Sequence, residues 1–438
     1  MEDSLGRSLV RLSRAGAIAA LALLAFPAAS IDTVQEWQVD ESTTGLLVED
    51  HRAPVVSIRL EFAAGTWSPW VEEHDAGVAF ELQLRDSKGD LRRRADRLAA
   101  GLSLSTGARS ATMFLTCGKE DLPAALELVR DVLRGVDLDR KALSRLRQEM
   151  KINWQAALKN PQFVLRQAGV RLLFREDDPR RRPSERPKLP GKDLEKLLAA
   201  RDALVRIPGR VVGFAGDLGL EEARRVAQGL LPRAGNEPAG MRPAFGPVAP
   251  ADRRPREATV RLPRLTQVYF AYGRDSLGWL DPDYAAALIA DHALGGHFNS
   301  RLMVALRQES GDTYGADVSD DDDLDPGVYA IGTFTRTDNA EATERRIRDV
   351  LAKFHAEGIT EEERAMAAGN VTGRRAFLRQ SPGQILATAM TERRHGLPYG
   401  FFDRQAEKAA ALPLDEINTF IRRFYDPGRL TMLTLRPE

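Results

Sequence analysis

A proline-rich segment near the middle of the chain sets the strongest limit on how it can fold. Between positions 232 and 256 the sequence carries prolines at 232, 238, 243, 247, 250 and 255, with glycines among them. Proline fixes φ and has no backbone N–H, so such a run resists both helix and sheet and is typical of a semi-extended linker. We therefore expect two domains, residues 31–231 and 257–438, joined by a linker at 232–256.

Each expected domain combines strands and helices. Residues 55–65 alternate apolar and polar side chains as a half-buried strand does, and helical patterns follow at 76–85 and 121–133. The second domain opens with a strand at 267–273, continues with a helix at 281–294, and ends in an apolar strand. Because these elements do not alternate regularly as βαβ units, the sequence predicts an α+β fold. The two halves look alike at this level, but their residue identity is too weak to establish a duplication.

The N-terminus has the pattern of a secretory signal peptide. Three arginines precede a short apolar stretch that ends in small residues at Ala28 and Ser30, so we expect residues 1–30 to be removed after Ser30. The apolar stretch is too short for a membrane anchor, and we expect no stable membrane insertion. The lone Cys117 cannot form an internal disulfide and reads as a buried thiol. These features predict a periplasmic or secreted protein.

The charges and histidines of the chain do not indicate a nucleic-acid or metal site. The formal net charge of the 438 residues is zero, which gives no overall basic field for nucleic acid. Arginine-rich runs at 92–97 and 177–188 are interpreted as solvated surface. The acidic loop at 317–327 is interpreted in the same way, because its glycine comes one position too late for a calcium loop and no glutamate ends the twelve-residue frame. Four histidines are isolated in sequence and surface-like in context, namely His51, His74, His355 and His395. His292 and His297, five apart, do not have a common metal-ligand spacing.

The segment from 294 to 314 is the most distinctive motif in the second domain. It reads LGGHFNSRLMVALRQESGDTY and places Arg307 and Tyr314 seven residues apart across a Gly-Asp break. A guanidinium and a phenol are both strong hydrogen-bond donors, which suits the recognition of peptide carbonyl groups. Without further context, an arginine on a polar helix face and a packed tyrosine are ordinary features.

The chain resembles the pitrilysin and insulinase type of zinc peptidase, the inverzincins, which include mitochondrial processing peptidase. The resemblance covers nearly all of the mature sequence and is carried by residues 50–69, 121–133 and 216–232, and most specifically by the motif at 294–314. It implies two similar domains, each an antiparallel sheet backed by helices and joined by a linker. It also implies that Arg307 and Tyr314 correspond to an Arg and Tyr pair that contacts the substrate backbone beside the zinc.

The metal motif of that family is missing. Active members carry HxxEH on the first helix, where two histidines hold zinc and the glutamate activates water. By position, Phe80 and Leu84 replace the histidines and Gln83 replaces the glutamate. Asn153 falls near the position of the third ligand, and Glu149, one turn earlier, is the only carboxylate that could substitute. We therefore expect no metal in this chain.

The chain lacks the zinc motif but keeps Arg307 and Tyr314. In this it resembles the subunit without HxxEH in bacterial heterodimeric members of the family. This resemblance implies a zinc-free subunit of a periplasmic heterodimeric metallopeptidase. Its partner would be a homologous subunit with intact HxxEH and a bound zinc, and its substrate a peptide or unfolded polypeptide. Two alternatives are a non-catalytic scaffold or peptide-binding protein of the same fold, and a self-sufficient hydrolase with a relocated metal site.

Overall fold

The structure is a computed structural model of the chain. It describes residues 34–85, 89–136, 139–186, 188–235, 257–320 and 323–438. We call residues 34–235 the N-terminal half and residues 257–438 the C-terminal half. The predicted signal peptide and most of the predicted linker lie outside the described residues. No helix within the described ranges is long and apolar enough to cross a membrane.

The N-terminal half follows the predicted order of strands and helices closely. The apolar residues of the predicted strand at 55–65 alternate into the core over eight residues, and the predicted helix at 121–133 is found with a shift of one residue. Its elements are β1 (Val34–Asp40), β2 (Thr43–Glu49), β3 (Val55–Phe62), α1 (Pro69–Glu73), α2 (Ala76–Glu81), η2 (Leu82–Leu84), α3 (Asp90–Arg97), β4 (Gly101–Thr106), β5 (Ala111–Gly118), α4 (Leu122–Arg134), α5 (Arg140–Ala157), α6 (Pro161–Leu173), η3 (Pro179–Ser184), α7 (Leu194–Val205), β6 (Arg210–Gly216) and α8 (Leu220–Leu230).

The C-terminal half contains a second sheet with a longer set of helices. Its elements are β7 (Glu257–Leu262), β8 (Gln267–Asp275), α9 (Tyr284–Gly295), α10 (Arg301–Met303), the π-helical η4 (Val304–Glu309), β9 (Ala316–Asp320), β10 (Val328–Arg336), η5 (Thr337–Asn339), α11 (Ala340–Glu357), α12 (Glu361–Leu378), α13 (Pro382–Arg394), α14 (Phe401–Ala411), α15 (Leu414–Phe424), η6 (Pro427–Arg429) and β11 (Thr431–Pro437).

The two sheets share one topology. The N-terminal sheet has the order β1-β2-β6-β3-β5-β4 and the C-terminal sheet the order β7-β11-β8-β10-β9. Apart from β1, the strands of the two sheets correspond in sequence order and position. The last strand of each half pairs in parallel with an early one, β6 with β2 and β11 with β7. This repeated order confirms the α+β class with two similar sheet-and-helix units and supports a duplication. The sheets are mixed, however, so the expectation of purely antiparallel sheets was wrong at one strand pair in each half.

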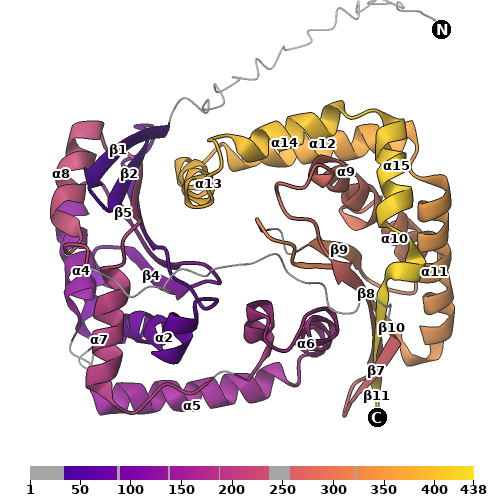
Figure 1. The fold of residues 1–438 in the computed structure, drawn as a ribbon, viewed down its shortest axis with the longest axis horizontal. Helices are drawn as coiled ribbons and strands as arrows, with labels where there is room; N and C mark the ends of the chain where they lie inside the picture. Colours follow the sequence, from indigo (N-terminus) through magenta and orange to yellow (C-terminus); the bar gives the residue numbers. More distant parts are fainter. Residues whose placement is uncertain (1–33, 86–88, 137–138, 187, 236–256, 321–322) are drawn as a thin grey trace, which may run out of the picture.

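One face of each sheet packs on helices of its own half. The N-terminal core joins β3 and β5 to α4 and α8, and the C-terminal core joins β8 and β10 to α9, α11 and α15. Figure 1 shows α4 and α8 on one outer side of the molecule and α11 and α15 on the other, with the two sheets turned toward each other. Burial of these two apolar cores is the main stabilising contribution in each half.

The other face of each sheet is covered by a helix from the opposite half. Helix α6 packs on β11 and β8 of the C-terminal sheet through Leu165, beside Leu433 and Leu435. Helix α13 packs on β2 and β6 of the N-terminal sheet through Leu386 and Met390. Both helices lie between the sheets in Figure 1. The halves are therefore continuous in sequence but exchange one helix each in space.

Ion pairs also join the halves. Arg109 of the N-terminal half donates from Nε to Asp323 at 2.8 Å and from Nη2 to Asp325 at 2.5 Å. Arg394 Nη1 of the C-terminal half lies 2.5 Å from Oε1 of the buried Glu61. Arg180 donates to the carbonyl oxygen of Pro326 and stacks over Phe174.

These contacts correct two sequence interpretations. The described part of the acidic segment begins in β9 and ends in ion pairs between the halves, and the basic run at 177–188 contains the buried Arg180. Short charge runs are usually solvated, but the packing of the two halves pairs Asp323 and Asp325 with Arg109 and buries Arg180 beside Pro326.

Candidate functional site

The first half of the candidate site is the frame that corresponds to HxxEH. It does not form one continuous α-helix, because α2 ends at Glu81 and residues 82–84 continue as a 3-10 helix. Phe80 is fully buried and its ring meets Phe62 edge-on at a centroid distance of 5.6 Å. Leu84 is half-buried against the same core. The two positions that would hold a metal are therefore occupied by apolar packing.

Gln83 has a structural role in place of a catalytic one. Its side chain is fully buried, its Nε2 donates to the carbonyl oxygen of Ala79 at 3.0 Å, and its Oε1 accepts from the N–H of Val136 at 3.0 Å. The amide thus satisfies a backbone donor of a neighbouring segment as well as a carbonyl of its own helix. A neutral amide has no basic group with which to activate water near neutral pH.

The helix that would carry the third ligand lies next to this frame. Asn153 is exposed on α5 and lines a cavity of about 710 Å³ together with Gly77 and Val78 of α2. Glu149 does not line it, and its carboxylate is paired with Arg85 at 2.8 Å. The structure therefore brings the two degenerate ligand segments together, as the resemblance implies, but among the described residues no three potential metal ligands meet there.

The cavity has a mixed lining. On α5, Met150, Trp154 and Ala157 face it at the spacing of one helix face, with Trp154 edge-on to Phe163 at 5.6 Å. Charged residues complete the lining, namely Glu72, Asp75, Arg182, Glu185, Arg186 and Lys188. Apolar walls with a few charged groups are typical of a binding pocket. The spacing of these α5 residues, four and then three positions apart, is a signal that is visible in the sequence.

The second half of the candidate site begins with Arg307. It lies on the π-helical segment η4, where Leu306 is buried and Arg307 is exposed. Its guanidinium stacks over the ring of Phe298 at 4.9 Å, a contact that fixes the side chain without using its N–H donors. Within the described residues Arg307 forms no ion pair, so the donors remain available to a ligand.

Tyr314 is displayed on an anchored loop. Gly311 has a φ of +65°, and the N–H groups of Asp312 and Thr313 both donate to the carbonyl oxygen of Leu306. The buried Asp312 accepts from Asn339 and Arg346, so the residues just before the tyrosine are held tightly. Tyr314 itself is 82% exposed.

The loop is equally fixed on the other side of the tyrosine. The carbonyl oxygen of Gly315 accepts from Thr313 Oγ1 and from Thr333 Oγ1, both at 2.9 Å. Tyr314 makes no hydrogen bond to any described residue. An exposed phenol on a loop that is bonded on both flanks is pre-organised to contact something outside the chain. Among the described residues, no hydrogen bond or ion pair joins Arg307 to Tyr314, or either of them to the degenerate frame.

The histidines do not form a metal site in the described ranges, where no three His, Cys, Asp or Glu side chains come together. His292 and His297 stack with ring centroids 4.9 Å apart, and burial beside His297 lowers the pKa of His292 to about 4. His395 is not the surface residue that the sequence suggested. Its side chain is only 5% exposed, edge-on to Trp279, and burial beside Arg394 lowers its pKa to about 4.

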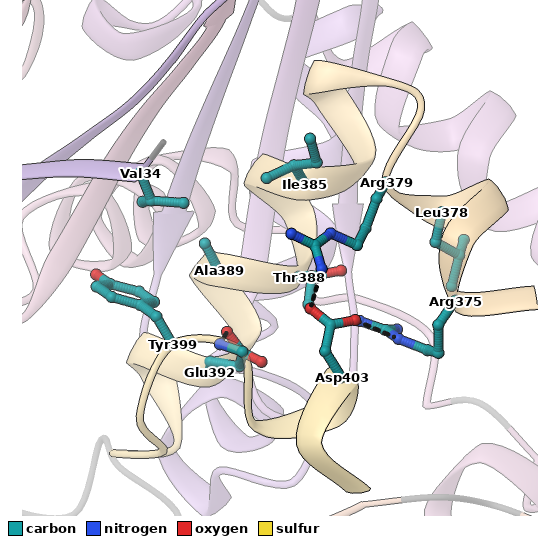
Figure 2. Close-up of a pocket in the computed structure, with 11 residues that line it drawn as sticks. Val34, Arg375, Leu378, Arg379, Ile385, Thr388, Ala389, Glu392, Tyr399 and Asp403 are labelled. Carbon is teal, nitrogen blue, oxygen red and sulfur yellow. Dashed lines mark hydrogen bonds and ion pairs between the residues drawn. The ribbon is translucent and has the colours of Figure 1, made fainter. Parts of the chain in front are cut away.

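A small hollow near α13 is not a candidate site. Figure 2 shows Arg375 and Arg379 directed at Asp403, with Nε of Arg375 3.0 Å from its Oδ1. The buried Glu392 accepts from the N–H of Gly400 at 2.9 Å. The hollow measures about 30 Å³, room for one water molecule, and its charged groups are already bonded within the protein.

Comparison with known proteins gives the context for this geometry. A family model described as the peptidase M16 inactive domain matches residues 193–370, from the start of α7 into α12. A search of the curated proteins finds no match.

Solved structures extend the likeness to most of the chain. The M16 inactive-domain structure from Pseudomonas fluorescens has 21% identity and a TM-score of 0.78, covering 92% of this chain and 98% of that one. A protease from Helicobacter pylori has 14% identity and a TM-score of 0.76, covering 92% and 99%. The periplasmic protease PqqL from Escherichia coli has 13% identity and a TM-score of 0.71, and the chain spans 46% of its length. At these identities the likeness shows a shared fold. The chain therefore has the fold of these M16 peptidases, and residues 193–370 match the family model of the peptidase M16 inactive domain.

Proposed function

We propose that this chain is the zinc-free subunit of a periplasmic heterodimeric zinc metallopeptidase. One contrast carries the proposal: core packing fills the metal-side positions Phe80, Gln83 and Leu84, while Tyr314 stands exposed on an anchored loop. A chain that keeps a pre-organised donor but has no means of activating water suits a composite site. The N-terminal signal pattern supports export.

The roles of this chain follow from donor chemistry. The homologous partner, with intact HxxEH and its zinc, would supply the attacking water. Tyr314 would donate its O–H to the carbonyl oxygen of the scissile peptide bond, where negative charge develops in the transition state. Arg307, held by Phe298, would donate to a neighbouring backbone carbonyl and fix the peptide in place.

The test combines this chain with the homologous zinc-bearing chain and follows cleavage of an unfolded polypeptide. Replacement of Tyr314 by Phe removes one donor and keeps the ring. We expect kcat to fall by about 10²-fold with little change in KM, because removal of one oxyanion donor typically costs that much.

The matched control is Phe377→Ala, which removes another exposed aromatic ring of the C-terminal half without touching the donor loop. It should leave kcat unchanged. A Tyr314→Phe complex that turns over at the wild-type rate would refute the composite site. Each chain should also be inactive alone, and metal analysis of this isolated chain should find no zinc.

A non-catalytic scaffold or peptide-binding protein of the same fold is the second candidate. The cavity of about 710 Å³ beside Asn153, with Trp154 and Phe163 in its lining, favours it. In that case the chain would bind unfolded peptide but would not stimulate cleavage by any zinc-bearing homologue. The mixing experiment separates the two functions directly.

A further inference from the structure

A second cavity lies on the inner face of the C-terminal sheet, beside α6. It measures about 390 Å³ and is lined by β8, β9, β10, β11 and α6. No sequence pattern indicated it, because α6 belongs to the opposite half of the chain.

Small residues on adjacent strands create the floor of this cavity. In the sheet register Ala271 lies opposite Gly332, and Gly273 lies opposite Ala330. Residues that alternate along a strand point to one face, so these four share the face that looks toward α6. Two neighbouring rows of glycine and alanine leave the sheet without the side chains that would otherwise fill the space.

The walls are apolar. Helix α6 contributes Leu165 and Leu173, and β11 contributes Leu433. The next row of the sheet closes one end with Tyr269 opposite Phe334, whose ring centroids are 5.5 Å apart. The cavity can therefore take up apolar surface, while exposed polar groups form its rim, namely Gln162, Arg166, Asp317 and Ser319.

The cavity is continuous with the loop that displays Tyr314. Gly315, the next residue, lines the cavity, and Thr333 on β10 both lines it and donates to the carbonyl oxygen of Gly315. A peptide bound to the phenol of Tyr314 would thus reach the rim of the cavity within one or two of its own residues. An extended peptide directs alternate side chains to one side, so one of them can enter the cavity and reach its floor.

We propose that this cavity is a specificity pocket that takes one bulky apolar side chain, aromatic or branched aliphatic, of the peptide that contacts Tyr314. Its volume is that of an ordinary ligand pocket, and its apolar walls with a polar rim match such a side chain attached to a polar backbone. The identity of the ligand as a peptide rests on the proposed function. The pocket itself belongs to this chain alone and can be tested without a partner.

The probe is an unstructured peptide of serine and glycine with a single central 4-fluorophenylalanine, observed by ¹⁹F NMR with the isolated full-length chain. A peptide with trifluoroalanine at the same position provides the small-side-chain comparison. We expect the aromatic peptide to bind at least tenfold more tightly, because it buries much more apolar surface in the cavity than the small side chain does.

Gly332→Leu should abolish that preference. A Cβ at this position meets only a carboxylate oxygen of Asp317, at 3.8 Å, so the new side chain fills the cavity without displacing backbone. Ala330→Leu fills the neighbouring row and serves as the second variant if the first does not fold. The control is Gly229→Leu on α8, where a Cβ has nothing within 4 Å. It should bind like the wild type.

Equal binding of the two peptides, no detectable binding of either, or an undiminished preference in a folded Gly332→Leu or Ala330→Leu chain would each overturn the pocket. Displacement of the bound aromatic peptide by the zinc-bearing subunit would also overturn it, because the cavity would then be covered by that subunit. A different result would refute the proposed function without refuting the pocket. If Tyr314→Phe leaves turnover unchanged while the aromatic preference persists, the composite site is wrong and the pocket stands.

Discussion

At the scale of single residues, His395 shows how burial sets chemistry in this molecule. Its Nε2 accepts from Nε of Arg394 at 3.3 Å, which fixes the neutral imidazole, and Trp279 packs edge-on against the ring. Asp323 is 4.0 Å away, too far to compensate for the loss of water and the neighbouring arginine. These surroundings lower the pKa of His395 to about 4, so the folded protein holds it uncharged.

This burial predicts a loss of stability in mild acid. The unfolded chain protonates His395 near its ordinary pKa of 6.5, whereas the folded chain does so only near 4. The contribution is therefore fully present above about pH 6.5, and it is lost as the pH falls toward 4. One such group accounts for roughly 3 kcal/mol at most. Urea unfolding of His395→Gln between pH 7 and pH 4 should show a shallower decline than the wild type, and parallel curves would contradict this account.

At the scale of elements, the segment from η4 to β9 is built to present one side chain. Gly311 follows shortly after the π-helical segment Val304–Glu309. Its φ of +65° lets the N–H groups of the next two residues donate to the carbonyl oxygen of Leu306. A left-handed residue at the end of a helix is a common way to satisfy its last carbonyl groups. The buried Asp312 then ties the loop to α11 through Arg346. These contacts fix the loop and so hold the exposed Tyr314 in one position.

Replacement of Gly311 by Ala should weaken this presentation. Its Cβ would meet nothing within 4 Å, so the cost is only that of a left-handed backbone, about 1–2 kcal/mol. Gly315→Ala is the matched control, because it also has open space but no positive φ. Urea unfolding should show a loss for Gly311→Ala and little change for Gly315→Ala. Equal losses would mean that the backbone conformation at Gly311 does not matter.

At the scale of the whole molecule, the exchanged helices make the two halves interdependent. The N-terminal sheet needs α13 to cover its inner face, and the C-terminal sheet needs α6 in the same way. Arg109 adds ion pairs to Asp323 and Asp325 across the same boundary. The molecule is thus one rigid support on which the Tyr314 loop and its neighbouring cavity are held.

Leu386→Ala tests this interdependence. Leu386 belongs to α13 of the C-terminal half but is buried on the N-terminal sheet, and its truncation should cost about 2–5 kcal/mol. Hydrogen exchange should show faster exchange in β2 and β6, which lie some 170 residues or more away in sequence. Phe377→Ala on the exposed face of α12 should not affect those strands. Unchanged protection of β2 and β6 would contradict the exchanged packing.

The sequence by itself determined the features that depend on local pattern. Alternating side chains such as those at 55–62 predicted the strands, and Phe80, Gln83 and Leu84 showed that the HxxEH residues are missing from that frame. Tyr314 stood out as a donor, but its role beside a partner's zinc stays a prediction.

Only the tertiary structure decided how distant segments meet. Local periodicity carries no record of contacts between residues hundreds of positions apart, so the parallel strand pairs and the exchange of α6 and α13 had no sequence signal. The burial of His395 and the ion pairs of Arg109 follow from that exchange of surfaces. The cavity beside Gly315 needs both the small residues of β8 and β10 and the placement of α6 from the opposite half over them, and only the packing of the two halves shows that placement.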